Sequence, residues 1–324
     1  MPPVDAGARL DALLARPSCA VLTDDDTPVV VAYSGGADSA ALLALACRAG
    51  RCVHAVHVDH GLRPESSREA ALAVAAAMMA GASTARAVRV EVGAGNLEER
   101  ARDARHEALE HARVQLGAAL TLLGHTLDDQ AETVLLAVLR GSGLAGLSGM
   151  PARRDAIARP LLDVRRSETR AVCSELGVDV VDDPTNHDRR LDRVWLRREL
   201  LPALSKRSGR DLAPVLARQA ARVAEESDHL DRAAAAALHR AGDPPSARAL
   251  AELDRVILRR ALRRLVGPPW IGGDAVDAAV DVVMGLRRAA ELPRGRTLAR
   301  HDGVLTVERT VTPSDTVPPT FGGT

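Results

Sequence analysis

Residues 34–39, Ser-Gly-Gly-Ala-Asp-Ser, carry the residue types that hold a phosphate group. They follow a run of valines, and an alanine-rich helical pattern begins within them. Two glycines allow backbone angles that other residues avoid, so N–H groups of the loop and of the helix start can converge on one anion. Asp38 could hold Mg²⁺ beside the phosphates. The alternative is an ordinary turn in which Asp38 or Ser39 caps the helix.

No lysine follows this loop, although the common nucleotide-binding loop G-x-x-x-x-G-K-S/T requires one. The only lysine of the chain is Lys206, in a distant segment, which excludes a Walker-type ATP site. A pyrophosphate bound here needs another source of positive charge, and Mg²⁺ held by Asp38 would supply it.

A second group of chemically capable residues lies in the acidic stretch GHTLDDQAET. On a helix, Asp128 and Glu132 are four residues apart and Asp129 and Glu132 are three apart, so each pair shares a face. Such carboxylates repel each other unless a cation lies between them, and Mg²⁺ or a substrate ammonium would serve. The alternative is a helix start capped by Thr126, with Asp129 completing a capping box. That alternative leaves His125 without a role.

Two further polar stretches follow the second and third apolar runs. In HVDHG (57–61), three ligand-type residues at one strand end do not form a tetrahedral metal site, and we expect His60 to pack beside a nucleotide. In the next stretch, Glu98, Arg102 and Arg105 lie on one helix face. Taken alone, that face is typical of a solvated, ion-paired surface.

A basic segment covers residues 189–210, where eight Arg or Lys residues stand against two acidic residues, a net charge of +6. The whole chain has 43 basic and 43 acidic residues, so a nucleic-acid partner would have to bind a local patch such as this one. The alternative is a solvated basic surface.

Apolar runs and helical patterns alternate in the first half of the chain. The apolar runs predict strands at 29–33, 52–58, 87–92 and 119–123. The periodic patterns predict helices at 38–49, 65–80, 97–115 and 128–139. This alternation predicts an α/β fold with a doubly wound, mostly parallel sheet. In such a sheet ligands bind at the carboxyl ends of the strands, where the polar stretches at 34–39, 59–63, 93–98 and 124–132 lie.

The second half of the chain is less regular, and a helical segment followed by a small α+β domain is predicted. The last residues contain too few apolar side chains to fold. The predicted domains are an N-terminal helix (1–22), the sheet domain (23–205), a helical linker (206–245), a small C-terminal domain (246–310) and a disordered tail (311–324).

Composition excludes several classes of protein. Two Trp, one Tyr and one Phe are too few for the aromatic stacking surfaces of RNA-recognition sheets or single-strand-binding barrels. The four cysteines form no C-x-x-C pair, which disfavours zinc ribbons and iron–sulfur ligation. No stretch is apolar over the ~20 residues of a membrane span, and we expect a soluble, cytoplasmic protein.

Six ordered motifs resemble those of one family. SGGADS resembles the PP-loop of the ATP pyrophosphatases, which cleave ATP between the α and β phosphates. The motifs similar to those of the tRNA(Ile)-lysidine synthetases are HVDHGLR, NLEERARDAR, GHTLDDQAET, RGSGLAGLSGM followed by RPLL, and DPTN followed by ELLP. Two positions depart from the family pattern, since His106 replaces a tyrosine and Val194 replaces an asparagine.

The resemblance implies a reaction. With ATP and Mg²⁺, the O2 atom of the wobble cytidine in a CAU-anticodon tRNA(Ile) would attack the α-phosphate, and the ε-amine of free L-lysine would then displace AMP to form lysidine. A homodimer is compatible with the sequence. The implied roles are catalysis by Asp38, Asp129, Glu132 and Arg105; nucleotide binding by Ser34, Gly35, Gly36, Ala37, Asp38, Ser39, His60 and His125; lysine binding by Asp129 and Glu132; Mg²⁺ binding by Asp38; and tRNA binding by Arg193, Arg197, Arg198 and the C-terminal domain.

Three other functions stay open. A sulfur-inserting tRNA enzyme would need a catalytic cysteine pair or cluster ligands, and no cysteines are spaced for either. An amidating synthetase would need an ammonia source, and no glutaminase-like half is present. A non-catalytic nucleotide- or RNA-binding module would leave the acidic face at 128–132 unexplained.

Overall fold

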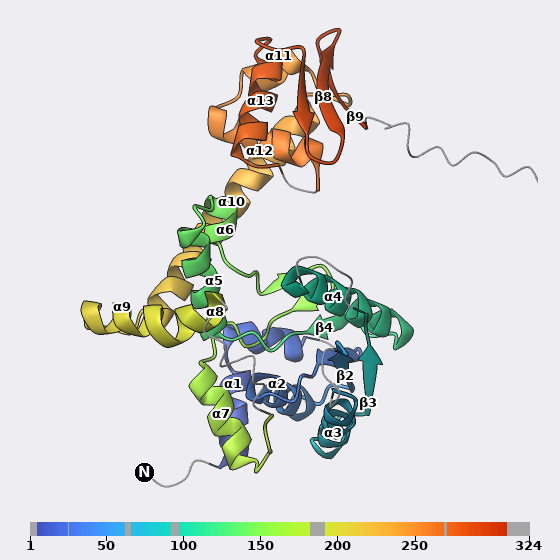
Figure 1. The fold of residues 1–324 in the computed structure, drawn as a ribbon, viewed down its shortest axis with the longest axis vertical. Helices are drawn as coiled ribbons and strands as arrows, with labels where there is room; N and C mark the ends of the chain where they lie inside the picture. The colour runs from blue at the N-terminus through green and yellow to red at the C-terminus, as the bar shows by residue number, and fades with distance from the viewer. Residues whose placement is uncertain are drawn as a thin grey trace, which may run out of the picture. The chain divides into compact units, whose positions relative to one another are not determined.

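The computed structural model describes residues 5–24, 26–61, 66–91, 97–181, 192–268 and 271–309. The chain divides into two compact units, Met1–Ala224 and Glu225–Thr324, whose elements are drawn in Figure 1. The division falls within the long helix α10 (Ala213–Arg240). The predicted tail at 311–324 lies outside the described residues.

The first unit contains a six-stranded sheet in the order β3-β2-β1-β4-β6-β5. Its strands are β1 (Val29–Ala32), β2 (Val53–Asp59), β3 (Thr84–Arg89), β4 (Leu120–Leu122), β5 (Arg153–Arg154) and β6 (Ile157–Ala158). All neighbours are parallel except β5 and β6, which pair antiparallel. The predicted mostly parallel α/β sheet is therefore confirmed.

The order of strands reverses beside β1, because β2 and β3 lie on one side of it and β4 on the other. The helices that follow β1 and β4, α2 (Ala37–Arg48) and α5 (Leu127–Leu139), begin at the same edge of the sheet. Gly124 lets the two helix starts approach, since a Cβ atom there would lie 3.0 Å from the carbonyl oxygen of Asp38. Ligands bind at such a reversal point.

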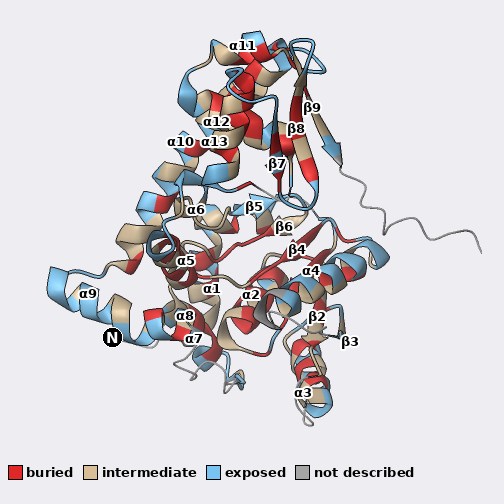
Figure 2. Cartoon of the chain, turned by 45° about the horizontal axis from the view of Figure 1, so that its top comes forward, coloured by how far each residue is buried: buried red, intermediate tan, exposed pale blue. Residues whose placement is uncertain are grey.

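Alternate side chains of β1 enter two cores, one on each face of the sheet. Val29 and Val31 belong to the larger core, and Val30 belongs to a smaller one. Figure 2 shows the central strands β1 and β4 and the inward helix faces as mostly buried. Each fully buried valine contributes roughly 1.5–3 kcal/mol of transfer free energy. The helices on the larger core are α1 (Ala6–Leu14), α2, α3 (Ser66–Met79) and α7 (Arg166–Glu175), and the helix on the smaller core is α4 (Leu97–Gln115).

The structure corrects two of the predicted elements. The third strand begins at Thr84 and ends at Arg89 rather than covering 87–92, because it pairs with β2 from His54 onward and β2 ends at Asp59. The predicted N-terminal helix at 1–22 consists of α1 and a separate 3-10 turn, η1 (Pro17–Leu22). Pro17 begins that turn, since proline lacks the N–H group that a continuous helix would need.

The described part of the basic segment contains three consecutive helical pieces, α8 (Asp192–Trp195), the π-helical turn η3 (Leu196–Leu200) and α9 (Leu201–Ser208). A π-helical turn inside a helix is rare overall, but where one occurs it is often at a functional site. It changes which side chains of the segment point inward.

A short helix, α6 (Leu144–Leu147), precedes β5.

The second unit is a small α+β domain with its own core, as predicted for the C-terminal part. Its elements are α11 (Ala247–Ala251), α12 (Arg255–Val266), α13 (Gly273–Val283) and the antiparallel strands β7 (Ala289–Leu292), β8 (Arg296–His301) and β9 (Val304–Arg309). Leu250, Leu262 and Leu298 are fully buried in it. Among the described helices of the chain, none has the length and apolar character to cross a membrane.

Candidate functional site

The loop between β1 and α2 leaves the start of α2 open to an anion. Gly35 has φ = +83°, a conformation that favours glycine. Ser39 Oγ donates to the Gly36 carbonyl oxygen at 2.9 Å and lies 3.2 Å from Ser34 Oγ, so the two serines hold the loop closed. No described side chain caps α2 at Gly36. The N–H groups of its first turn are therefore available to a phosphate.

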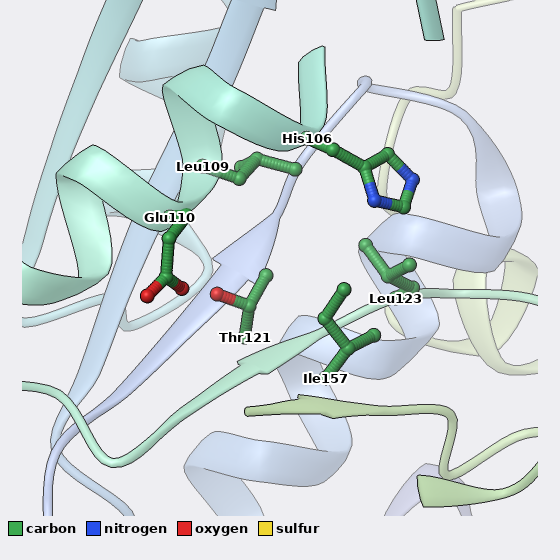
Figure 3. Close-up of a pocket in the computed structure, with 6 residues that line it drawn as sticks. All are labelled: His106, Leu109, Glu110, Thr121, Leu123 and Ile157. Carbon is green, nitrogen blue, oxygen red and sulfur yellow. The ribbon is translucent and has the colours of Figure 1, made fainter. Parts of the chain in front are cut away.

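A small cavity beneath α4 is not the substrate site. Its volume is about 20 Å³, which is room for one water molecule. Figure 3 shows that His106, at the position of the family's tyrosine, is one of its lining residues. The Thr121 hydroxyl faces no hydrogen-bond partner among the described residues. The cavity is lined by His106, Leu109, Glu110, Thr121, Leu123 and Ile157.

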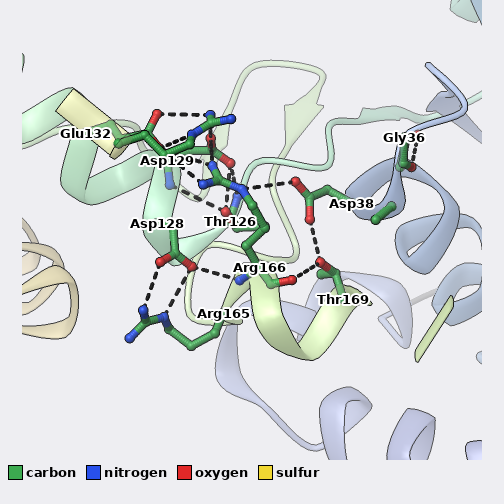
Figure 4. Close-up of polar contacts among 12 residues, drawn as sticks. Gly36, Asp38, Thr126, Asp128, Asp129, Glu132, Arg165, Arg166 and Thr169 are labelled. Atoms are coloured by element: carbon green, nitrogen blue, oxygen red, sulfur yellow. Dashed lines mark hydrogen bonds and ion pairs between the residues drawn. The ribbon is translucent and has the colours of Figure 1, made fainter. Parts of the chain in front are cut away.

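Three carboxylates and two guanidinium groups meet where α2, α5, α7 and η3 converge, and most of them appear in Figure 4. Arg166 Nη2 lies 2.5 Å from Asp129 Oδ1, and its Nη1 lies 3.2 Å from Glu132 Oε1. Its Nε lies 3.6 Å from Asp38 Oδ2. Arg197 Nε donates to Glu132 at 2.7 Å, and its Nη2 lies 3.5 Å from Asp129. We call these five residues the acid–arginine cluster; three negative and two positive charges give it a net charge of −1.

Asp129 both caps the start of α5 and pairs with a cationic side chain. Its Oδ2 atom accepts from the backbone N–H of Thr126 at 2.8 Å and from the Thr126 hydroxyl at 2.7 Å, which completes the capping box of α5. Its Oδ1 atom accepts from Arg166. Burial pushes the pKa of Asp129 up, but Arg166 and the Thr126 hydrogen bonds outweigh burial and leave that pKa below its usual value. The carboxylate is therefore ionised at neutral pH.

A side chain of α7 also forms a hydrogen bond with the carboxylate of Asp38. The Thr169 hydroxyl donates to Asp38 Oδ1 at 2.5 Å. Burial raises the pKa of Asp38, and Thr169 and Arg166 offset only part of that rise. An additional cation near this carboxylate would therefore stabilise its charged form.

Asp128 is not part of the acid–arginine cluster, but it accepts a hydrogen bond from the start of α7, the helix that carries Arg166. Its Oδ2 atom accepts from the backbone N–H of Arg166 at 2.7 Å, and Arg165 Nη2 lies 2.9 Å from its Oδ1. Arg165 also forms an ion pair with Asp211, just before α10. The acids of α5 are thus fixed by the first turn of α7.

Three arginines, Arg102, Arg105 and Arg193, lie close together, and His60 lies near Arg105. Burial lowers the pKa of Arg105, and the neighbouring charges of Arg102 and Arg193 lower it further. Burial likewise lowers the pKa of His60, followed by the charge of Arg105. Arg105 Nε and His60 Nδ1 are buried and have no hydrogen-bond partner among the described residues. Buried polar atoms are normally paired, so this cationic group fits an anionic ligand.

His125 is neutral in the folded protein. Burial lowers its pKa to about 4, the largest of several effects. Arg159 Nε donates to His125 Nδ1 at 3.3 Å, and since arginine only donates, Nδ1 must be the acceptor. The ring proton is therefore on Nε2, which makes His125 a hydrogen-bond donor. Burial also lowers the pKa of Arg159, to about 10.

The structure brings together most of the residues that the sequence singled out. Asp38, Asp129 and Glu132 share one cluster, and His60 lies near Arg105. Arg197, which the resemblance assigned to tRNA, contacts the acids instead of lying with the exposed Arg198. The motif residues Asn96 and 183–186 and the side chain of Glu98 lie outside what the structure describes.

Sequence reasoning missed Arg165, Arg166 and Thr169. A signal for the two arginines was present in the sequence, because they stand side by side at the N-terminal end of α7, where the helix dipole disfavours positive charge. Two adjacent arginines there indicate acidic partners elsewhere in the fold. Nothing in the sequence pairs Thr169 with Asp38, which lies 131 residues away.

The residues at this edge fit Mg²⁺ bound together with a nucleotide. Among the described residues, no group of three or more His, Cys, Asp or Glu could hold a metal ion on its own. Mg²⁺ on nucleotides usually needs only one or two carboxylates, with phosphate oxygens and water completing its shell. Asp38, with Asp129 nearby and an uncapped helix start two residues before it, meets that requirement.

Comparison with known proteins decides the family. The PP-loop domain model matches residues 7–204. The tRNA(Ile)-lysidine synthase of Salinispora arenicola is 44% identical over 303 residues, covering 87% of this chain and 91% of the relative. The chain belongs to the tRNA(Ile)-lysidine synthase family. The synthase of Nocardia farcinica is 46% identical over 238 residues, covering 72% of this chain and 74% of the relative.

A solved structure resembles this lysidine synthase family member in fold. A U34-tRNA thiolase from Methanococcus maripaludis, solved with its 4Fe-4S cluster, superposes with a TM-score of 0.54. The two are 18% identical, and the match covers 68% of this chain and 76% of the thiolase. At that identity the likeness shows the PP-loop fold alone.

Proposed function

We propose that this protein is a ligase that uses ATP to join free L-lysine to C2 of the wobble cytidine of a CAU-anticodon tRNA(Ile), forming lysidine. The observation that carries the proposal is the acid–arginine cluster directly beside the uncapped start of α2. A site for an ammonium group thus adjoins a site for phosphates. The family of the chain supports the same reaction.

In the first step, we propose that ATP lies on residues 34–39 and that Asp38 holds Mg²⁺. When bound, Mg²⁺ would neutralise charge that develops on the pyrophosphate. The N–H groups of Gly36 to Ser39 would bind the phosphate oxygens, while Arg105 and His125 Nε2 donate to the α-phosphate region. The cytidine O2 atom bonds to the α-phosphorus, and the bond to the pyrophosphate oxygen breaks.

In the second step, the acids of α5 receive lysine. With Asp38 assigned to Mg²⁺, Asp129 and Glu132 are the carboxylates of the acid–arginine cluster that remain for an ammonium group. Asp129 and Glu132 bind the ε-ammonium and accept its proton, and the amine nitrogen then bonds to C2 as the C2–O2 bond breaks and AMP leaves with that oxygen. Arg197, ion-paired with Glu132, keeps this carboxylate in place.

The remaining assignments concern tRNA. We propose that Arg193 and Arg198, with the basic segment around them, bind the phosphates of the anticodon arm, and that the C-terminal unit adds further contacts. Net positive charge over a short segment is what phosphate binding requires. Because tRNA, ATP and lysine are cytoplasmic, we propose that the enzyme works there.

The test is a reaction of purified protein with ATP, Mg²⁺, labelled lysine and a transcript of CAU-anticodon tRNA(Ile). The proposal predicts label in the tRNA with one AMP released per lysine. A transcript with a GAU anticodon is the matched control and should remain unlabelled. Turnover of ATP that depends on another acceptor, without lysine, would refute the proposal.

A sulfur-transfer reaction is the principal rival, given the fold. All four cysteines are free thiols, and two of them, Cys19 and Cys173, are buried. Burial raises the pKa of each of these two to about 11, so neither is a thiolate nucleophile at neutral pH. These features favour the lysine reaction.

A further inference from the structure

The carboxylate of Asp38 is held by a hydroxyl group from a distant helix. Thr169 Oγ1 lies 2.5 Å from Asp38 Oδ1 and 2.9 Å from the carbonyl oxygen of Arg166, one turn earlier in α7. Thr169 has no exposed surface. A hydroxyl has a single proton to donate, and the charged carboxylate is the stronger acceptor of the two.

The hydroxyl is fixed in direction. A helical threonine settles in the rotamer that brings Oγ1 to a carbonyl oxygen of the preceding turn, which is the contact with Arg166. One turn later in α7, Cys173 Sγ donates to the Ala37 carbonyl oxygen at 3.3 Å. The same face of α7 therefore contacts two consecutive residues at the start of α2.

Helix α7 is itself anchored on its far side. Arg16, just before η1, is ion-paired with Glu168, and Arg9 of α1 is ion-paired with Glu175 at 2.6 Å. These ion pairs connect α7, and with it Thr169, to the N-terminal segment of the chain.

We propose that Thr169 is a positioning residue that orients the Asp38 carboxylate for Mg²⁺ and the nucleotide phosphates. Its hydrogen bond fixes Oδ1. Among the described residues, the one polar contact given for Oδ2 is the longer 3.6 Å contact with Arg166, which a metal ion can replace. This inference rests on the proposed role of Asp38. Groups that orient a metal ligand in this way change metal affinity or activity by about 10–100-fold when they are removed.

The test compares Thr169→Val, which keeps the branched shape, with Thr169→Ser, which keeps the hydroxyl. Calorimetry would measure the Mg²⁺ concentration that gives half-maximal binding of a non-hydrolysable ATP analogue. We expect Thr169→Val to raise that concentration about tenfold or more, Thr169→Ser to stay within about twofold of wild type, and KM for lysine to change little in either variant.

The matched control is Thr133→Val, because Thr133 makes the same type of bond to a helix carbonyl, that of Asp129 at 2.8 Å, but no described contact with a carboxylate. Its Mg²⁺ requirement should equal that of wild type. If Thr169→Val is too unstable to purify, Thr169→Ala provides the same comparison.

Two outcomes would overturn the inference: an unchanged Mg²⁺ requirement in Thr169→Val, or an equal rise in Thr169→Ser. Asp38→Asn separates this failure from failure of the proposed function. If Asp38→Asn weakens Mg²⁺-dependent binding and Thr169→Val does not, only the role of Thr169 is refuted. If neither variant alters it, the assignment of Asp38 to Mg²⁺ fails as well.

Discussion

Replacing Arg166 with glutamine should destabilise the sheet domain in a pH-dependent way. Arg166 is 14% exposed and contacts Asp129, Glu132 and Asp38 at 2.5, 3.2 and 3.6 Å. Removing one partner of a buried ion pair costs about 3–5 kcal/mol. In the variant, Arg197 still contacts two of the acids, so we expect a loss of stability at the lower end of this range, about 3 kcal/mol. For a unit of this size, that loss lowers the melting midpoint by roughly 6–12 °C.

The pH dependence follows from the carboxylates. In wild type the pKa of Asp129 is lowered, so its stabilising effect is present above the unfolded pKa and is lost as pH falls through the folded pKa. Without Arg166, burial dominates and the Asp129 pKa rises above its unfolded value. The carboxylate then destabilises the fold at neutral pH, and protonation relieves this as pH falls.

The measurement is thermal unfolding of wild type and Arg166→Gln from about pH 8 to about pH 5. The deficit of the variant should be largest at the higher pH and should shrink on acidification. Arg165→Gln is the control, because Arg165 is 30% exposed and pairs at the edge of the site, and we expect a loss of about 1 kcal/mol or less. A deficit in Arg166→Gln that is under 2 °C, or that grows as pH falls, would refute the reasoning.

Two further variants probe the other side of the site. Arg105→Leu removes a buried guanidinium whose Nε has no hydrogen-bond partner among the described residues, so the melting midpoint should hold or rise while tRNA adenylation falls about a hundredfold. A lower midpoint with unchanged adenylation would contradict this. His125 has a folded pKa of about 4, below its usual value, so wild type should lose stability as pH falls from about 6.5 to about 4, by roughly 1 kcal/mol per pH unit. His125→Gln should lack that loss in a denaturant titration at each pH, and an unchanged slope would show that His125 is not the group responsible.

The sequence predicted the elements that position the site because their signals are local. The valine run of β1, the glycines after it and the Thr126–Asp129 capping box each act within a few residues, and all appear in the structure. The edge strand β3 was displaced in the prediction, since its limits depend on where its partner β2 ends.

The cations of the acid–arginine cluster could not be predicted in the same way. Arg166 and Arg197 lie 37 and 65 residues from the acids they contact, and only the packing of α7 and η3 brings them there. Sequence reasoning expected a ligand cation, Mg²⁺ or an ammonium group, at Asp129 and Glu132. The structure places two arginines of the chain itself against these acids.

The most direct test of the account is a single-turnover reaction of Asp129→Asn with labelled ATP and labelled lysine. Asparagine keeps an oxygen for the Thr126 cap but loses the charge proposed to hold the lysine ammonium. The account predicts that adenylated tRNA still forms and accumulates while lysine transfer is abolished. Full lysidine formation by this variant would contradict the assignment of Asp129, and with it the division of the site into a phosphate half and an ammonium half.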